Sequence, residues 1–417
     1  MVSVIKPVRG THDLIGEEAK RHDHVIEISK RIFSLYGFQE WMTPVFEYTN
    51  VFSRSLGETS DIVSKEMYSF QDRGGDSLTL RPEGTAGICR ALVTNGLTQS
   101  LPQKIFYSGP MFRYERPQKG RYRQFHQIGA ELMGVSTPFA DAEVIAMGYH
   151  ILKELGLDEG AVLELNTLGD KNSRSIWREA LVNYFKSVQA QLSKDSLVRL
   201  EKNPLRILDS KDVNDRMLLA QAPLLHEYLT KDALEFWDKL RKALDQFKIP
   251  FKENPYIVRG LDYYSHTVFE FVTEKLGAQG TLLAGGRYEG LVGDMGGGDV
   301  PSIGWAAGVE RLALLLENPP IKTNPVVIIP FSEDHHSVAF PLLQAIRYNG
   351  MGAEIAYKGN LRKQLERAHK SKALLALLIG DNEVNQNNVQ VKDLISGTQR
   401  EVSLTEIVSY LKNKLAN

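Results

Sequence analysis

At 417 residues the chain is longer than one ordinary domain, and about 150 residues per domain predicts two or three domains. Hydrophobic residues make up 42% and charged residues 24%, which excludes wholesale disorder and collagen-like repeats. The single cysteine, Cys89, excludes an internal disulfide or a multi-thiolate metal site. With 50 Lys and Arg against 51 Asp and Glu, the net charge of −1 argues against a purely electrostatic nucleic-acid binder but allows a local basic groove.

The apolar segments predict no association with a membrane. No run approaches the length of about 18 residues that a membrane span needs. The first residues also lack the apolar core of a signal peptide. We therefore expect a cytoplasmic protein, which agrees with its use of a single cysteine.

The first part of the chain predicts a helix followed by strands. Apolar residues recur at helical spacing over 17–36, and Gly37 is a plausible end to this helix. Residues 78–80 predict a short strand, which runs into Arg81-Pro82-Glu83-Gly84-Thr85 and then a helix through Leu92.

Two longer strands, 105–113 and 123–133, are predicted on either side of a loop that contains Pro117 and Gly120. In the second strand Ile128, Ala130 and Leu132 share one face, whereas Arg123, Gln127 and Glu131 share the other. The first of these faces is predicted to be packed. The second carries more polar groups than a simple surface strand needs, so we expect them to meet a ligand.

The loop between these strands is rich in arginine. Only Glu115 opposes a cluster of five cations, Arg113, Arg116, Lys119, Arg121 and Arg123. Such a cluster can be a solvated hairpin, but arginine also suits bidentate recognition of phosphate oxygens. The register of the polar strand favours the binding role.

The remainder predicts a helical segment and then a small α/β domain. Residues 171–248 carry apolar stripes at helical spacing, such as Trp237, Leu240 and Leu244. Strand character returns at 256–272, and a proline-bracketed linker precedes residue 326. Beyond it strands and helices alternate to a closing helix at 404–415, which predicts an α/β unit of about 90 residues.

Glycines suggest turns and one close approach to a ligand. Residues 284–288 and 296–298 are interpreted as glycine-rich turns, and no Walker-type loop is present. Gly304 and Gly308 flank a segment that leads into a helix at 309–316 and would admit a planar ligand. Arg311 lies in the first turn of that helix, where an anion would be stabilised.

The histidines do not predict a metal or a hydrolase triad. The adjacent pair His335 and His336 would point in different directions, and no cysteine lies at ligand spacing. His22, His24 and His126 have no Ser or Cys partner pattern, so we interpret them as surface or packing residues.

Several of these stretches resemble the signature motifs of class II aminoacyl-tRNA synthetases, in the form found in histidyl-tRNA synthetases. Residues 112–117, together with Arg121 and Phe125-His126-Gln127, resemble the second motif, and residues 304–311 the third. Residues 37–56 are similar to the weaker first motif. Segments more specific to the histidyl family are residues 9–13, 81–85, 259–264, 267–270 and 284–288. Tyr114 and Trp305 depart from the usual histidine and phenylalanine but keep an aromatic ring.

The resemblance covers essentially the whole chain and implies its fold. We expect an α+β catalytic domain on an antiparallel sheet over residues 1–324, with a helical insertion at about 171–250. A C-terminal α/β anticodon-binding domain would occupy residues 325–417. The first motif would lie at a homodimer interface.

The resemblance also implies the chemistry. The histidine carboxylate would attack the α-phosphate of ATP to give histidyl-adenylate and pyrophosphate, and the terminal ribose of the cognate tRNA would then take the histidine. Because the first nucleophile is already an anion, catalysis needs positioning and charge neutralisation rather than a general base. Mg²⁺ would arrive with ATP, no metal would be held by the protein itself, and no editing is expected.

The resemblance also implies a role for individual residues of this chain. Arg113 and Arg259 would be catalytic at the α-phosphate. ATP would be bound by Arg113, Glu115, Arg121 and Arg311, with Glu115 at the adenine. L-Histidine would be bound by Glu83, Thr85, Arg113, Gln127, Glu131, Arg259, Tyr263 and Tyr264. A loop facing the tRNA would contain Arg116, Gln118, Lys119 and Arg123.

Three other interpretations remain open from sequence. A non-catalytic, histidine-binding regulatory paralogue is disfavoured by the presence of Arg259 and of a C-terminal domain. A class II synthetase for another amino acid is disfavoured by Glu131 and Tyr263-Tyr264. A generic nucleic-acid-binding module would leave the ATP-site residues unexplained.

Overall fold

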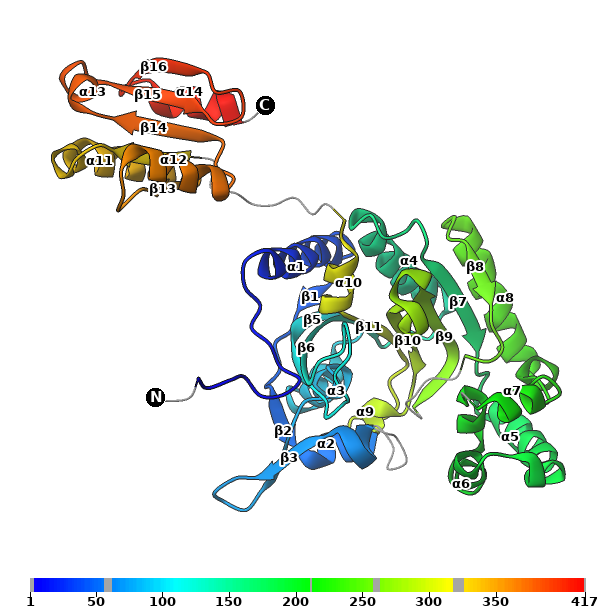
Figure 1. Cartoon of the computed structure of the whole chain (residues 1–417). Helices are drawn as coiled ribbons and strands as arrows, with labels where there is room; N and C mark the ends of the chain where they lie inside the picture. The colour runs from blue at the N-terminus through cyan, green and yellow to red at the C-terminus, as the bar shows by residue number, and fades with distance from the viewer. Residues whose placement is uncertain (1–3, 56–61, 211, 258–262, 318–325, 416–417) are drawn as a thin grey trace. The chain divides into compact units, whose positions relative to one another are not determined.

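The computed structural model of the chain describes residues 4–55, 62–210, 212–257, 263–317 and 326–415. It separates into two compact units, Met1–Pro319 and Pro320–Asn417 (Figure 1). The expected linker and Arg259 lie outside the described residues. Within the described residues, no helix is long and apolar enough to cross a membrane.

A large mixed sheet forms the centre of the first unit. Among the described residues it has eight strands in the order β1-β5-β6-β11-β10-β9-β7-β8. The six central strands are antiparallel neighbours, as expected, and the edge pairs β1–β5 and β7–β8 are parallel. The strands are β1 (Gln39–Glu40), β5 (Gln103–Phe112), β6 (Gln124–Met133), β7 (Val162–Thr167), β8 (Phe251–Glu253), β9 (Tyr264–Val272), β10 (Thr281–Tyr288) and β11 (Ser302–Gly308).

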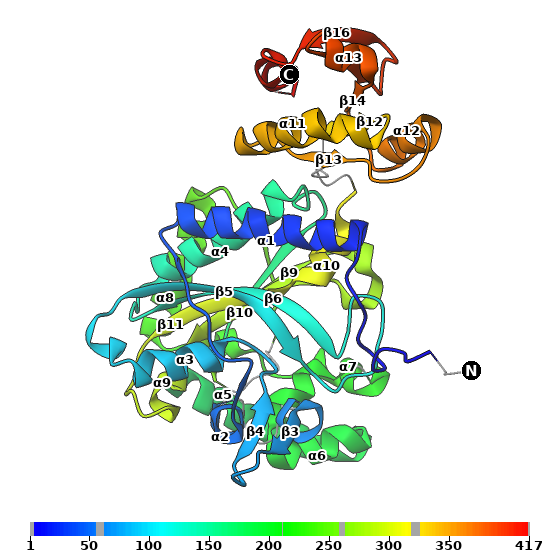
Figure 2. The ribbon, with the colours of Figure 1, turned by 90° about the vertical axis from the view of Figure 1, so that its left-hand side faces the viewer.

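One face of this sheet is packed by helices and carries the main core. Ile128, Ala130 and Leu132 of β6 join this core, which confirms the predicted packed face. Figure 2 shows α1 and α4 above the sheet, and α3 and α9 on the opposite side. The helices of this unit outside the insertion are α1 (Glu17–Leu35), α2 (Thr49–Ser55), α3 (Thr85–Thr94), α4 (Pro138–Glu154), α8 (Lys231–Gln246), α9 (Leu291–Asp294) and α10 (Val309–Leu315).

The opposite face of the sheet carries α3 and a second, smaller core. Here Tyr107 of β5 fills the space that two glycines leave open, because a Cβ on Gly84 or Gly129 would overlap its ring. A small separate sheet, in the order β2-β4-β3, leads into α3. Its strands are β2 (Phe46–Tyr48), β3 (Tyr68–Gln71) and β4 (Ser77–Leu80).

The glycine pair in 284–288 was expected to form a turn, and this prediction is wrong. Gly285 and Gly286 lie in the middle of β10. A Cβ on Gly285 would overlap Trp305 and the carbonyl of Gly304 in β11, and one on Gly286 would overlap Tyr264 in β9. The glycines therefore permit close approach of neighbouring strands rather than a reversal of the chain. Gly304–Gly308 is likewise strand, whereas Gly296 and Gly298 have the positive φ angles of a turn.

The helical segment divides between two cores. Helices α5 (Lys171–Ser187), α6 (Lys194–Lys202) and α7 (Val213–Leu219) surround their own apolar cluster, which includes Trp177 and Leu181. Helix α8 instead contributes Trp237, Leu240 and Leu244 to the main core, where it packs against α4. Only the first part of the segment is thus a separately packed insertion.

The second unit is an α/β domain. Among its described residues a five-stranded sheet has the order β13-β12-β14-β15-β16, with the first three strands parallel and the last two antiparallel. The strands are β12 (Val326–Pro330), β13 (Ala353–Ile355), β14 (Leu375–Ile379), β15 (Asn388–Asp393) and β16 (Gln399–Ser403). The helices are α11 (His336–Tyr348), α12 (Leu361–Lys370), α13 (Asp381–Asn385) and α14 (Ile407–Leu415). The β15–β16 hairpin was not predicted, and the closing helix begins three residues later than expected.

An ion pair buried in the first unit joins α4 to β10. The guanidinium of Arg287 contacts both oxygens of the Asp141 carboxylate, and the two side chains are 1% and 0% exposed. Arg287 also donates to the carbonyls of Val135, at 2.9 Å, and Thr137, at 3.2 Å. Thr267 of β9 donates to Asp141, so the pair connects three elements.

Removing one partner of this pair should lower the free energy of unfolding far more than removing both. We expect Arg287→Met to lower the free energy of unfolding of the first unit by about 3–5 kcal/mol, because Asp141 is left charged and buried. The combined Arg287→Met and Asp141→Leu variant should recover part of that loss. Urea denaturation followed by tryptophan fluorescence is suitable, because all four tryptophans lie in this unit. Equal stability of the single variant and the wild type would contradict this assignment.

Candidate active site

A cavity of about 340 Å³ lies on the α3 side of the large sheet. Residues from the loop before α3, the loop after β5, and β6, β9, β11 and α10 contribute to its wall. The structure brings together in this wall ten of the residues singled out in the sequence: Glu83, Thr85, Arg113, Glu115, Arg121, Gln127, Glu131, Tyr263, Tyr264 and Arg311.

The inner end of the cavity is built around the carboxyl group of Glu131. In the sheet, Glu131 lies opposite Gly304 of β11, where a Cβ would overlap its carboxyl group. One oxygen accepts a hydrogen bond from the Thr85 hydroxyl and the other from the Tyr288 hydroxyl, both at 2.7 Å. Glu131 is only 1% exposed. Its position is therefore fixed by α3, β10 and β11 together.

Burial changes the protonation of this carboxyl group. Loss of hydration raises the pKa of Glu131 from 4.5 to about 8, although the hydrogen bonds from Tyr288 and Thr85 act to lower it. The nearby negative charge of Glu83 adds to the rise. Glu131 thus titrates close to neutral pH, where its carboxyl group can accept or donate a hydrogen bond.

Glu83 supplies a second buried carboxylate at the start of α3. Its oxygens accept the backbone N–H groups of Thr85, at 2.6 Å, and Ala86, at 2.8 Å. These are donors that the first turn of a helix leaves without intrahelical partners. Burial raises the pKa of Glu83, and its backbone hydrogen bonds oppose that rise.

Polar and aromatic groups complete the inner end. Gln127 of β6 is buried, and its side-chain oxygen has no hydrogen-bond partner among the described residues. Buried polar atoms are normally paired, so this oxygen is a candidate ligand contact. Tyr263 and Tyr264 have ring centroids 4.5 Å apart and close the wall beside Tyr288.

The outer end of the cavity is cationic. The Nε of Arg113 donates to the carbonyl of Pro82 at 2.8 Å, and its Nη1 lies 3.8 Å from Glu115. Arg121 pairs with the other oxygen of Glu115 at 3.1 Å. Arg311 of α10 donates to the carbonyl of Thr281 at 3.0 Å. Burial lowers the pKa of Arg311, and the positive charges of Arg121 and Arg113 add to this effect. An anion at this end would relieve the mutual repulsion of the three guanidinium groups.

The structure separates Arg123 from the other residues of the predicted tRNA-facing loop. Arg116, Gln118 and Lys119 are exposed. Arg123 is half-buried, because its guanidinium stacks 3.9 Å from the ring centroid of Tyr114 and its backbone N–H donates to the carbonyl of Gly10. Its backbone therefore joins the loop to the N-terminal segment, and its side chain packs against the loop itself.

Tyr288, which donates to Glu131, is a residue of the site that the sequence pattern does not predict. Tyr288 belongs to the motif at 284–288. Because that motif was interpreted as a turn, the position of Tyr288 at the end of a strand was not predicted. If residues 284–288 are interpreted as a strand, the alternation of side chains between the two faces places Tyr288 on the same face as Gly286, toward the cavity.

Comparison with known proteins covers nearly the whole chain. A family model described as histidyl-tRNA synthetase matches residues 10–312, and one described as anticodon binding domain matches residues 325–414. The histidine–tRNA ligase of Gluconacetobacter diazotrophicus is 63% identical over 98% of this chain and 99% of its own length. That of Gluconobacter oxydans is 60% identical over the same shares. The crystal structure of apo S. aureus histidyl-tRNA synthetase superposes with a TM-score of 0.82 at 34% identity, covering 98% of this chain and all of the other.

A largely antiparallel catalytic sheet, in a chain that also contains an anticodon-binding domain, defines an aminoacyl-tRNA synthetase of class II. The coverage and sequence identity of the matches identify the family within this class as well. The chain belongs to the histidyl-tRNA synthetase family, which confirms the resemblance seen in the sequence.

The raised pKa of Glu131 predicts a specific pH dependence of stability. The folded protein keeps this proton between about pH 4.5 and pH 8, whereas the unfolded chain releases it, so the stabilisation is lost as pH rises through that window. Relative to Glu131→Gln, the wild type should therefore lose roughly 2–3 kcal/mol of unfolding free energy from pH 5.5 to 7.5.

Urea denaturation at a series of pH values measures this difference. Glu159→Gln, which alters an exposed carboxylate, is the matched control and should show no such trend. A constant difference between the wild type and Glu131→Gln would mean that Glu131 is already ionised throughout this range.

Proposed function

We propose that the chain is an ATP-dependent histidine–tRNA ligase. It would join L-histidine to AMP with release of pyrophosphate and then transfer the histidine to the 3′ end of its cognate tRNA. One observation carries the proposal: a buried acidic pocket shaped by Glu131 opens into a cavity whose far end holds three arginines. A small cationic side chain and a polyphosphate would fit those two ends in the geometry that adenylation needs.

Histidine would bind at the inner end. Glu131 and Tyr264 would contact the imidazole, and Glu83, Thr85 and Gln127 would receive the ammonium group. Tyr263 would pack beside them. Because Glu131 and Gln127 are buried, an apolar side chain of similar size would leave polar groups unpaired, and sites of this kind reject such analogues by about 10⁴–10⁵-fold.

ATP would bind at the outer end. Arg113 would contact the α-phosphate, Arg121 and Arg311 the β- and γ-phosphates, and Glu115 the adenine. Arg259 would act across the α-phosphate, although it lies outside the described residues. Mg²⁺ would arrive with the polyphosphate, and guanidinium groups dominate the protein's own contribution there. With the carboxylate of histidine as nucleophile, these cations stabilise the charge that develops at phosphorus.

The tRNA would meet two parts of the chain. The second unit would bind the anticodon, and the exposed loop with Arg116, Gln118 and Lys119 would face the acceptor end. Arg123, which holds this loop in place, would act indirectly. We place this reaction in the cytoplasm, as the family resemblance implies.

We also propose that the protein acts as a homodimer. The small sheet β2-β4-β3 presents aromatic side chains to solvent, and Phe46, Tyr48 and Phe70 are 49%, 56% and 45% exposed. These residues lie in or near the segment that resembles the first class II motif, and Met42 beside them is 83% exposed. An apolar patch of this kind is typical of a surface that a second copy covers.

The regulatory paralogue is not supported as an alternative. The two relatives named above cover 98% of the chain and are histidine–tRNA ligases, and the anticodon-binding domain is present. The decisive experiment incubates the protein with ATP, Mg²⁺, bulk tRNA and each amino acid in turn, and measures acid-stable aminoacyl-tRNA. Charging by histidine alone is expected. Histidine binding without charging would overturn the proposal in favour of the paralogue.

The role of Arg113 can be tested by a conservative change. Arg113→Lys keeps a positive charge but loses the planar fork whose Nε is anchored on Pro82. We expect histidine-dependent exchange of pyrophosphate into ATP to fall by about 10²–10³-fold, with the fold intact. Arg178→Lys, on the exposed side of α5, is the control. An exchange rate near that of the wild type would show that Arg113 does not stabilise the transition state.

The loop residues should affect only the second step. Lys119→Ala and Gln118→Ala are expected to reduce transfer to tRNA several-fold and leave pyrophosphate exchange unchanged, because both side chains lie outside the cavity. Lys153→Ala, an exposed lysine at the end of α4, serves as the control for charge. Equal losses in both steps would contradict a loop that faces the tRNA.

A further inference from the structure

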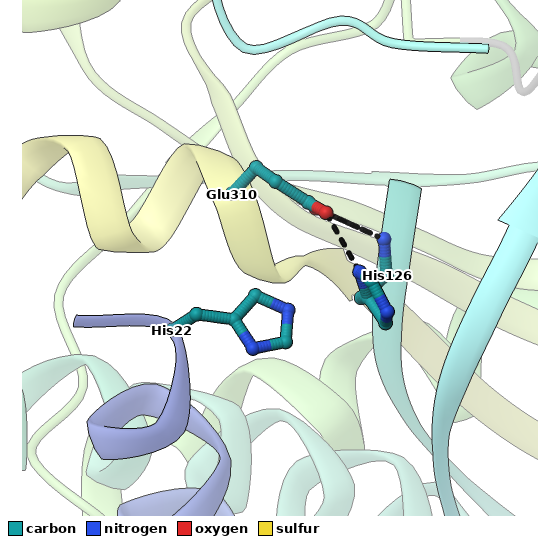
Figure 3. Close-up of side chains that lie close together, drawn as sticks. All are labelled: His22, His126 and Glu310. Atoms are coloured by element: carbon teal, nitrogen blue, oxygen red, sulfur yellow. Dashed lines mark hydrogen bonds and ion pairs between the residues drawn. The ribbon is translucent and has the colours of Figure 1, made fainter. Parts of the chain in front are cut away.

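A cluster of two histidines and one glutamate lies at the packed face of β6. His22 comes from α1, His126 from β6 and Glu310 from α10, and Figure 3 shows the three side chains converging. Sequence analysis interpreted the two histidines as surface or packing residues. The structure adds the glutamate and brings the three together from distant parts of the chain.

His126 and Glu310 form the tighter half of the cluster. Both carboxylate oxygens of Glu310 accept the backbone N–H of His126, at 2.9 and 3.0 Å. One of them also lies 2.9 Å from Nδ1 of the same residue. Glu310 is 7% exposed, so its negative charge is held in an enclosed position.

His22 completes the cluster, and its two ring nitrogens differ in their surroundings: Nδ1 lies 4.0 Å from a carboxylate oxygen of Asp23. The residue is 7% exposed, and its ring lies edge-on to that of His126, with centroids 4.5 Å apart. The Nε2 atom of His22 has no hydrogen-bond partner among the described residues, although it is buried. Burial and the neighbouring His126 lower the pKa of His22, which favours the neutral imidazole. Buried polar atoms are normally paired, so this nitrogen is a candidate ligand contact.

The spacing of the three groups is close to that of a metal site. One ligand atom from each residue can be chosen so that all lie within 4.8 Å of one another. A tetrahedral zinc ion with bonds of about 2.0–2.1 Å has ligands roughly 3.3 Å apart. The separation of 2.9 Å between His126 and Glu310 is near that value, and His22 needs only a small side-chain movement to join them.

A second cavity, of about 490 Å³, borders the cluster. His22 and Glu310 form part of its wall, together with His12, Glu18 and Tyr122. This space gives an ion a path of entry and room for a water molecule as fourth ligand. The cavity also shares Glu310 and Tyr122 with the cavity proposed to bind ATP.

We propose that His22, His126 and Glu310 bind a divalent transition metal ion of the zinc type. Two imidazoles and one carboxylate are nitrogen and oxygen ligands that zinc prefers, and they are a poor set for Mg²⁺. The ion would link α1 and α10 to β6. It would be distinct from the Mg²⁺ that accompanies ATP, and its role would be structural. By fixing Glu310 and His126, the ion would position the residues that follow them in the chain, Arg311 and Gln127, both of which line the candidate active site.

The test uses the full-length chain without a histidine tag, stripped of metal and then dialysed against Zn²⁺ or Co²⁺. We expect about one zinc ion per chain by elemental analysis, and visible absorption bands from bound Co²⁺. His22→Phe keeps an aromatic ring and removes the ligand atom, so it should weaken Zn²⁺ binding by at least about 100-fold and abolish the Co²⁺ bands. His24→Ala, on the same helix, is the matched control and should bind as the wild type does.

Thermal unfolding separates metal binding from a folding defect. Without metal, His22→Phe should unfold close to the wild-type temperature, whereas Zn²⁺ should raise the melting temperature of the wild type by a few degrees and leave the variant unchanged. A wild-type chain that binds neither ion in stoichiometric amounts would overturn the proposal. So would equal Zn²⁺ binding by the wild type and His22→Phe.

Discussion

The site depends on the burial of one carboxyl group inside a β-sheet. Burying Glu131 is costly unless both of its oxygens are hydrogen-bonded, and Thr85 and Tyr288 meet that condition. Room for the group exists only because the residue opposite in β11 is Gly304. The start of α3, the end of β10 and the register of β11 against β6 must therefore form together, and a shift of one residue would remove the pocket.

The two ends of the cavity carry opposite electrostatic strain. At the inner end burial raises the pKa of both Glu131 and Glu83, and the negative charge of Glu83 adds to the rise at Glu131. At the outer end burial lowers the pKa of Arg311, and the neighbouring arginines add to this effect. Each end is relieved by a ligand of opposite charge. In the binding mode proposed above, histidine and ATP would supply those charges in the order in which the two ends follow along the cavity, and the charged groups already in place would orient them.

The sequence was informative where a regular pattern extended over many residues. The alternation in 123–133 predicted both faces of β6, and the alternation of strands and helices after residue 325 predicted the fold of the second unit. It failed at Gly285-Gly286, since a pair of glycines fits a turn and a close strand contact equally well. The β15–β16 hairpin was missed because its residues are largely polar and its apolar alternation is short.

The cluster of His22, His126 and Glu310 could not be predicted from residue spacing in the sequence, because no local pattern connects three residues from distant elements. Its position nevertheless has a consequence for the active site. Glu310 and Arg311 are consecutive in the short helix α10, and the first contacts His126 while the second borders the cationic outer end of the cavity. A helix of seven residues has little stability of its own, so its orientation depends on such side-chain contacts. The same contact that holds α10 against β6 therefore also sets the direction of Arg311.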